Sequence, residues 1–189
     1  MNKMLILLLL TIGCISCKNA TKEIDKIEIA KQYYKALDNT DDSKIASLLT
    51  DSILIIETEY DYKQTFSLKE YVEWCKWDAV FEPTYKILQI EKEGETIKAK
   101  ISKIDKRILF LHEEPIVTNE VLRFADDKIS SIEKIKYVVF NDTTFVKNRE
   151  ALLSWIDKNY PDFKKFIYDQ TEAGGIQYLK AIELYKNRK

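Results

Sequence analysis

Residues 24–57, IDKIEIAKQYYKALDNTDDSKIASLLTDSILIIE, decide the fold of this chain. Ala30, Tyr33 and Leu37 recur at helical spacing, so we expect one face of a first helix to be buried, with Tyr33 pointing inward. The polar residues 38–42 are rich in turn and cap formers. The apolar spacing behind them predicts a second, shorter helix.

A strand is predicted directly after the second helix. Residues 53–56 are Ile-Leu-Ile-Ile, a run rich in β-branched residues that is too short for a helix. The run is apolar enough to be covered on both faces. Glu57 closes it with a carboxylate at the strand end.

This part of the sequence resembles the opening of the nuclear transport factor 2-like superfamily. The likeness lies in residues 33–41, Ile45 and residues 48–51. This group includes SnoaL-like polyketide cyclases and ketosteroid isomerases. Residues 121–129 resemble the late β-hairpin of the same group, and the likeness spans roughly two thirds of the chain. It implies an α+β fold, in which a curved antiparallel sheet wraps around the N-terminal helices as a cystatin-like cone over residues 24–140. Superfamily members often dimerise through the sheet, so the resemblance leaves a homodimer open, whereas the sequence does not identify the oligomeric state.

The resemblance also implies candidate catalytic residues. Tyr33 aligns with the tyrosine of the ketosteroid isomerases, Glu57 aligns with their carboxylate base, and Glu120 aligns with their second, protonated acid. A buried acid and a tyrosine can stabilise an oxyanion while another carboxylate moves a proton. This chain has Glu where the isomerases have Asp, which changes the reach of both acids. The competing interpretation is structural: Tyr33 would be a core residue, and the glutamate at the strand end, Glu57, would be solvated.

Composition limits the class of protein. At 189 residues, the chain accommodates one domain and an appendage. Lys and Arg number 30 against 31 Asp and Glu, without a concentrated tract of either sign, so nucleic-acid binding is not expected.

The first 17 residues have the features of a lipoprotein signal peptide. Lys3 supplies the positive region, and residues 4–13 form an apolar segment too short to cross a bilayer. Small residues precede both Cys14 and Cys17, as in a bacterial lipobox. Cys17 is the preferred lipidation site because polar residues follow it at once, with Cys14 as the alternative and a plain cleaved signal as a third. The expected location is the bacterial cell envelope, where residues 18–23 tether the domain to a membrane through its lipid anchor.

Cys75 and His112 offer little metal or nucleophile chemistry. Cys75 is the single cysteine of the body, and its helical stripe predicts a buried apolar thiol. His112 stands beside two glutamates without a spacing that converges on an ion, so a surface loop is expected. We therefore expect no metal and no cofactor.

A third helix is predicted from Ser67 and Glu70, which form a capping-box pair. Residues 60–63 are expected to turn the chain toward this helix. The helix carries Trp74 and Trp77 on a second apolar face, which suggests a cavity or partner-binding surface.

Two hairpins are predicted further along the chain, over residues 85–104 and 116–139, whereas residues 105–114 remain unassigned. Residues 141–189 form a helical extension, whose first helix is expected to be capped by Asn148. An extension of this size is too small to fold alone. We expect it to cover the Trp74 and Trp77 face or the mouth of the cone.

Two functional hypotheses follow. In the first, the protein is a non-enzymatic envelope lipoprotein whose cone binds a small apolar molecule or a partner peptide. In the second, it is an acid/base isomerase or cyclase that uses Tyr33, Glu57 and Glu120 on a carbonyl compound. The second hypothesis requires these three side chains to converge on one cavity.

Overall fold

The computed structural model describes residues 25–163 and 166–188. The predicted signal peptide, the predicted lipidation site Cys17 and the predicted tether lie outside these residues. No helix of the described residues is long and apolar enough to cross a membrane.

The opening helices form where the apolar spacing predicts them. Helix α1 spans Lys26–Asp38 and begins at Asp25, whose carboxylate accepts hydrogen bonds from two amides of the first turn. Helix α2 spans Asp42–Leu48 and is capped by Asp41. Strand β1, Leu49–Glu57, follows without a break.

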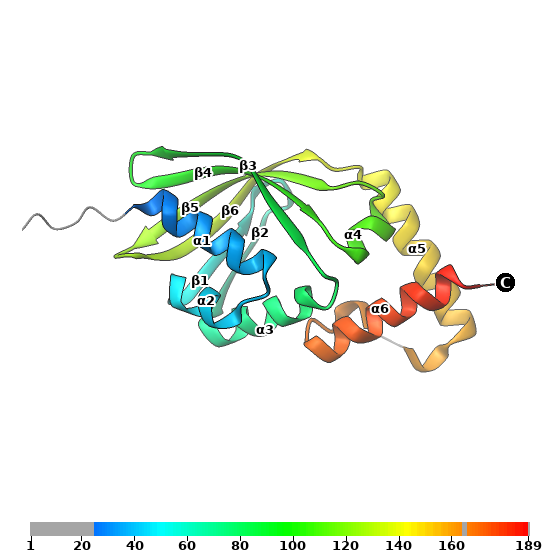
Figure 1. The fold of residues 1–189 in the computed structure, drawn as a ribbon. Coiled ribbons are helices and arrows are strands. Elements are labelled where there is room, and N and C mark those ends of the chain that lie inside the picture. The colour runs from blue at the N-terminus through cyan, green and yellow to red at the C-terminus, as the bar shows by residue number, and fades with distance from the viewer. Residues whose placement is uncertain (1–24, 164–165, 189) are drawn as a thin grey trace, which may run out of the picture.

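The described strands form a six-stranded sheet in the order β2-β1-β6-β5-β4-β3. Its further members are β2 (Tyr62–Ser67), β3 (Thr84–Glu93), β4 (Thr96–Ile104), β5 (Ile116–Ala125) and β6 (Lys128–Val139). The β1–β6 pairing is parallel and the other pairings are antiparallel. Helices α1, α2 and α3 lie along one side of this curved sheet (Figure 1), so the predicted α+β cone is confirmed.

Residues 60–63 are not simply a turn toward the next helix. A short 3-10 helix, Thr58–Tyr60, and a left-handed Asp61 reverse the chain, and strand β2 then pairs antiparallel with β1. The prediction of a turn is therefore wrong for residues 62–63, which belong to strand β2. Strand β2 was missed because its side chains are almost all exposed, which leaves no apolar alternation to detect.

Helix α3, Leu68–Ala79, starts at the predicted capping box. The Ser67 hydroxyl accepts from the Glu70 amide, and the Glu70 carboxylate accepts from the Ser67 amide at 2.8 Å. Cys75 is buried on this helix, and burial raises the pKa of its thiol. Cys75 is therefore an apolar core residue at neutral pH.

The expectation of a surface loop around His112 is wrong. Residues 106–111 form helix α4 (Lys106–Leu111), and His112 is only 2% exposed. Its Nδ1 lies 2.8 Å from the Glu114 carbonyl oxygen, its Nε2 accepts from the Asn141 amide at 2.6 Å, and its ring stacks on Phe140. Both ring nitrogens have partners, which makes burial tolerable.

The extension contains helix α5 (Asp142–Asn159), two short 3-10 helices (Pro161–Phe163 and Phe166–Tyr168) and helix α6 (Glu172–Lys186). Asn141 caps α5, so the prediction of Asn148 as its cap is wrong. The Asn148 amide instead donates to carbonyl oxygens of α4. A turn-forming residue inside a helix can serve a tertiary contact that sequence does not reveal.

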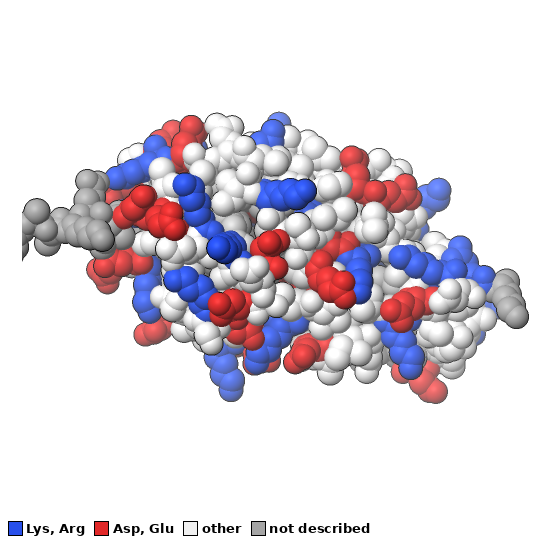
Figure 2. All heavy atoms as spheres, in the orientation of Figure 1, with Lys and Arg blue, Asp and Glu red and all other residues white. Residues whose placement is uncertain are grey.

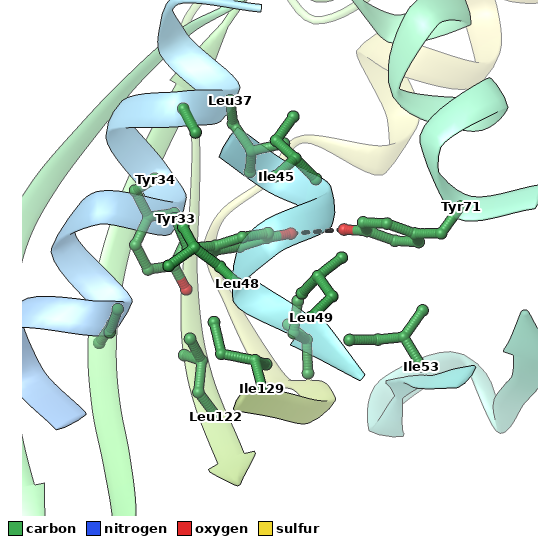
Figure 3. Packing of buried hydrophobic residues seen from close by; sticks show 14 of the residues in the cluster. Tyr33, Tyr34, Leu37, Ile45, Leu48, Leu49, Ile53, Tyr71, Leu122 and Ile129 are labelled. Carbon is green, nitrogen blue, oxygen red and sulfur yellow. Dashed lines mark hydrogen bonds between the residues drawn. The ribbon is translucent and has the colours of Figure 1, made fainter. Parts of the chain in front are cut away.

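The described residues form two apolar cores. The first lies between the sheet and helices α1 to α3, and Figure 3 shows Tyr33 and Tyr71 meeting inside it. The second lies where α5 and α6 meet the end of α3, at one end of the sheet (Figure 1). Its buried members come from the cone and from the extension: Trp77, Phe81, Leu111, Leu152, Ile156, Phe166, Tyr178, Ala181 and Ile182.

Charged side chains of both signs are interspersed over the face seen in Figure 2. Neither sign gathers into a broad patch there. This face offers no basic footprint of the kind that tracks a nucleic-acid backbone.

Candidate functional site

A cavity of about 430 Å³ lies between the sheet, the helices and the start of the extension. All three catalytic candidates, Tyr33, Glu57 and Glu120, line it together with Trp74 and Trp77. Helix α1 supplies the tyrosine, β1 and β5 supply the acids, and α3 supplies the tryptophans. The cavity therefore brings together every described residue that sequence reasoning assigned to a site.

Tyrosines dominate the wall. Among the described residues, seven line the cavity: Tyr33, Tyr34, Tyr60, Tyr62, Tyr71, Tyr85 and Tyr137. Such rings give a cavity apolar faces together with hydrogen-bonding edges. The wall therefore suits a flat, mainly apolar guest.

The hydroxyls of Tyr33 and Tyr71 are hydrogen-bonded to each other, as the dashed line in Figure 3 shows. Burial raises the pKa of both phenols, which keeps them neutral. A pair of neutral hydroxyls has two protons and uses one between its oxygens. The second proton is available to an acceptor in the cavity.

Glu120 is held by its own neighbours and not by Tyr33. The Tyr34 hydroxyl donates to one carboxylate oxygen at 2.7 Å, and the Thr118 hydroxyl donates to the other at 2.7 Å. Glu120 is 8% exposed, so this acid is buried with both oxygens satisfied.

Glu57 is tied to strand β6. Its oxygens accept from the Lys134 ammonium at 2.6 Å and from the Tyr137 hydroxyl at 2.8 Å. Burial raises the pKa of this carboxyl, but the Lys134 charge and these two hydrogen bonds outweigh it, and the net pKa is lowered. A carboxylate with a lowered pKa is a weak base at neutral pH.

Sequence reasoning missed most of the polar partners. Thr118 could have been found, because it lies two residues before Glu120 on the same face of a strand. Tyr34 was hidden because its neighbour Tyr33 already occupied the predicted buried stripe of α1. Lys134 and Tyr137 depend on the register between β1 and β6, which local sequence does not encode.

A second cluster of charges stands at the end of the cavity nearest the extension. Lys103 of β4 and Arg107 of α4 line the cavity there, backed by the buried carboxylates of Asp78 and Asp105. The Asp78 oxygens accept from Lys103 at 2.5 Å and from Tyr85 at 2.9 Å. Among the described residues, no group of three or more His, Cys, Asp and Glu side chains is placed to hold a metal ion.

An outer groove adjoins the cavity. It shares Phe66, Trp74 and Gln170 with the cavity wall, so these side chains stand between the interior and the surface. Gln170 comes from the segment just before α6. The extension thus contributes to the boundary of the site.

A curved sheet folded over helices around such a cavity is also the fold of solved structures that are described as a nuclear transport factor 2-like protein and as a candidate ketosteroid isomerase.

Particular solved structures carry the same fold at low sequence identity. A nuclear transport factor 2-like protein of unknown function from Cytophaga hutchinsonii ATCC 33406 is 10% identical, with a TM-score of 0.51 over 67% of this chain and 98% of its own. A candidate ketosteroid isomerase from Kribbella flavida DSM 17836 is 12% identical, with a TM-score of 0.51 over 61% of this chain and 79% of its own. Another protein from Kribbella flavida DSM 17836 is 12% identical, with a TM-score of 0.52 over 68% and 96%. No protein-family model and no curated protein sequence matches this chain.

Proposed function

We propose that this protein is a binding module for a small, mainly apolar or aromatic molecule. The observation that carries the proposal is the cavity of about 430 Å³, whose wall is built largely of aromatic rings. Small-molecule sites commonly measure about 300–1,000 Å³ and combine apolar walls with a few polar groups. This size favours a small molecule over a partner peptide.

The hydrogen bonds of the acids favour binding over acid/base catalysis. Glu57 is neutralised by Lys134, and its lowered pKa makes it a poor proton acceptor. Both Glu120 oxygens accept hydrogen bonds from hydroxyls, so neither is presented to a substrate as a donor. An isomerase-like mechanism would need both of these arrangements to change when substrate binds.

The proposal is tested by titrating the domain, residues 24–189, with the uncharged fluorophore N-phenyl-1-naphthylamine. We expect a saturable rise in fluorescence with one molecule bound per chain. Ile116 lines the cavity, so Ile116→Trp should fill part of it and weaken binding about tenfold or more.

Val138→Trp is the matched control. Val138 is exposed on strand β6 and is not part of the cavity wall, so this variant adds the same bulk outside the cavity. Equal binding by both variants, or no saturable binding by the wild type, would refute the proposed site.

We also propose that acyl chains on Cys17 hold this module at the bacterial envelope. The support is the sequence of the first 17 residues, which resembles a lipoprotein signal peptide. Expression in bacteria with labelled palmitate should label the wild type and Cys14→Ala, but not Cys17→Ala. Label that persists in Cys17→Ala and disappears in Cys14→Ala would move the anchor to Cys14, and no label in any form would refute lipidation.

A further inference from the structure

Two buried hydrogen-bond donors at the extension end of the cavity lack acceptors. Among the described residues, Trp77 Nε1 and Arg107 Nε have no hydrogen-bond partner, although both residues line the cavity. Trp77 is only 4% exposed. Buried donors without partners cost stability, so two of them side by side point to an acceptor that occupies the cavity.

The two donors belong to one stacked unit. The Arg107 guanidinium carbon lies 4.9 Å from the centre of the Trp77 ring and 5.4 Å from that of Phe81. Stacking fixes the plane of the guanidinium against the Trp77 ring. The helix start at Asp105 positions Arg107, because the Asp105 carboxylate caps α4.

The neighbouring carboxylates do not satisfy Arg107. Asp105 lies 3.7 Å from a guanidinium nitrogen and 3.6 Å from the Lys103 ammonium, both beyond hydrogen-bond distance. Asp78 is paired directly with Lys103 at 2.5 Å. Among the described residues, Arg107 Nε and the nearby Asp105 Oδ2 both lack a hydrogen-bond partner, so Asp105 supplies a counter-charge but no hydrogen bond to Arg107.

We propose that this end of the cavity binds the carboxylate of a ligand whose aromatic body fills the tyrosine-lined remainder. The inference rests on the proposed function and names its ligand class, an aromatic carboxylic acid. A carboxylate can accept from the edge of the guanidinium and from the indole N–H together. The apolar body then lies toward Tyr33 and Tyr71, where the spare hydroxyl proton can meet a polar substituent.

The experiment measures displacement of bound N-phenyl-1-naphthylamine by 2-naphthoate and by 2-naphthamide at neutral pH. These competitors share one ring system and differ in charge at the same position. We expect the wild type to bind the acid at least about tenfold more tightly than the amide, as a charged hydrogen bond provides. Arg107→Gln should remove most of that preference, and the affinity of this variant for the uncharged fluorophore is measured separately, because Arg107 also lines the cavity.

Lys106→Gln is the matched control, because it removes one positive charge at the residue directly before Arg107. Lys106 pairs with Glu82 at the surface and does not line the cavity, so the preference for the acid should persist. Trp77→Phe keeps an aromatic ring but removes the indole N–H donor, so it should reduce the preference partly. If Arg107→Gln does not fold, the preference of the wild type for the acid over the amide, and its reduction in Trp77→Phe, still test the proposal.

Each outcome separates the two proposals. Equal displacement by acid and amide would mean that water satisfies these donors, and would overturn the carboxylate site while cavity binding stands. An acid preference that survives both Arg107→Gln and Trp77→Phe would place the anion elsewhere and overturn it too. Failure of the fluorophore to bind the wild type would overturn both.

Discussion

Asp78 is the residue whose charge most directly links stability to the wall of the site. It is buried, and Lys103, which lines the cavity, donates to it at 2.5 Å. Burial raises the pKa of the Asp78 carboxyl, but Lys103 and Arg107 outweigh this effect and the net pKa is lowered. The ion pair therefore stabilises the folded state whenever Asp78 is ionised.

The variant Asp78→Asn should lower the free energy of unfolding by about 3 kcal/mol at neutral pH, because it leaves the partly buried Lys103 ammonium without its closest partner. The folded-state pKa of Asp78 lies below the unfolded value of about 3.9. Its contribution is therefore complete above that value and disappears as the pH falls through the folded pKa.

Urea unfolding measured across the acid range checks this expectation. The difference between wild type and Asp78→Asn should begin to narrow as the pH falls below about 4, the unfolded-state pKa, and should disappear once the pH is below the lower folded-state pKa, where the native carboxyl is protonated too. Asp51→Asn removes an exposed carboxylate from β1 and serves as the control. A difference that is independent of pH would show that the ionised pair is not what stabilises this part of the fold.

The candidate site could be predicted from sequence only in part. The resemblance assigned Tyr33, Glu57 and Glu120 to one candidate site, and all three line the cavity. This was predictable because a fold determines which positions face inward. It did not predict that Tyr34, and not Tyr33, would bond to Glu120. Hydrogen-bond partners depend on side-chain directions and strand register, which spacing alone does not determine.

At the scale of secondary-structure elements, α6 approaches α3 closely because of Gly175. A Cβ atom added at this position would lie 3.0 Å from the Trp77 carbonyl oxygen and 3.1 Å from a carbon of the Trp77 ring. A backbone atom cannot move aside as a flexible side chain can. A side chain at this position would therefore force α6 or Trp77 to shift by a few tenths of an ångström.

We expect Gly175→Val to push α6 away from α3 and to lower the free energy of unfolding by about 1–3 kcal/mol. Urea unfolding followed by tryptophan fluorescence measures this, with a shift of native emission to longer wavelength as Trp77 gains contact with water. Ala173 lies two residues before Gly175 at an exposed position of the same helix, so the control variant Ala173→Val should cost much less. Equal effects of both variants would contradict the close packing.

Elements with strong apolar periodicity were predictable, and those without it were not. The capping box of α3 and the alternation of β4 have local signatures, and both elements form as expected. Strand β2 is exposed along nearly its whole length, and α4 is only six residues long, so neither carries enough periodicity. His112 became a buried connector through contacts with Phe140 and Asn141, which only tertiary structure supplies.

At the scale of the whole molecule, the extension completes the cavity. The cone supplies the sheet and the tyrosines, while Phe145 and Gln170 of the extension also line the wall. The extension also buries Trp77 in the second core. We infer that binding of a small molecule should change the environment of the tryptophans at the junction of cone and extension.

The three tryptophans allow a direct measurement of this central claim. Trp74 and Trp77 line the cavity, whereas Trp155 of α5 packs against Tyr160 and Tyr185 and is not part of the wall. Fluorine NMR of protein labelled with 5-fluorotryptophan, assigned with single Trp→Phe variants, follows all three during titration with N-phenyl-1-naphthylamine. We predict saturable shifts for Trp74 and Trp77 and an unmoved Trp155 resonance. Unmoved Trp74 and Trp77 resonances, or an equal shift of all three, would contradict an interior binding site.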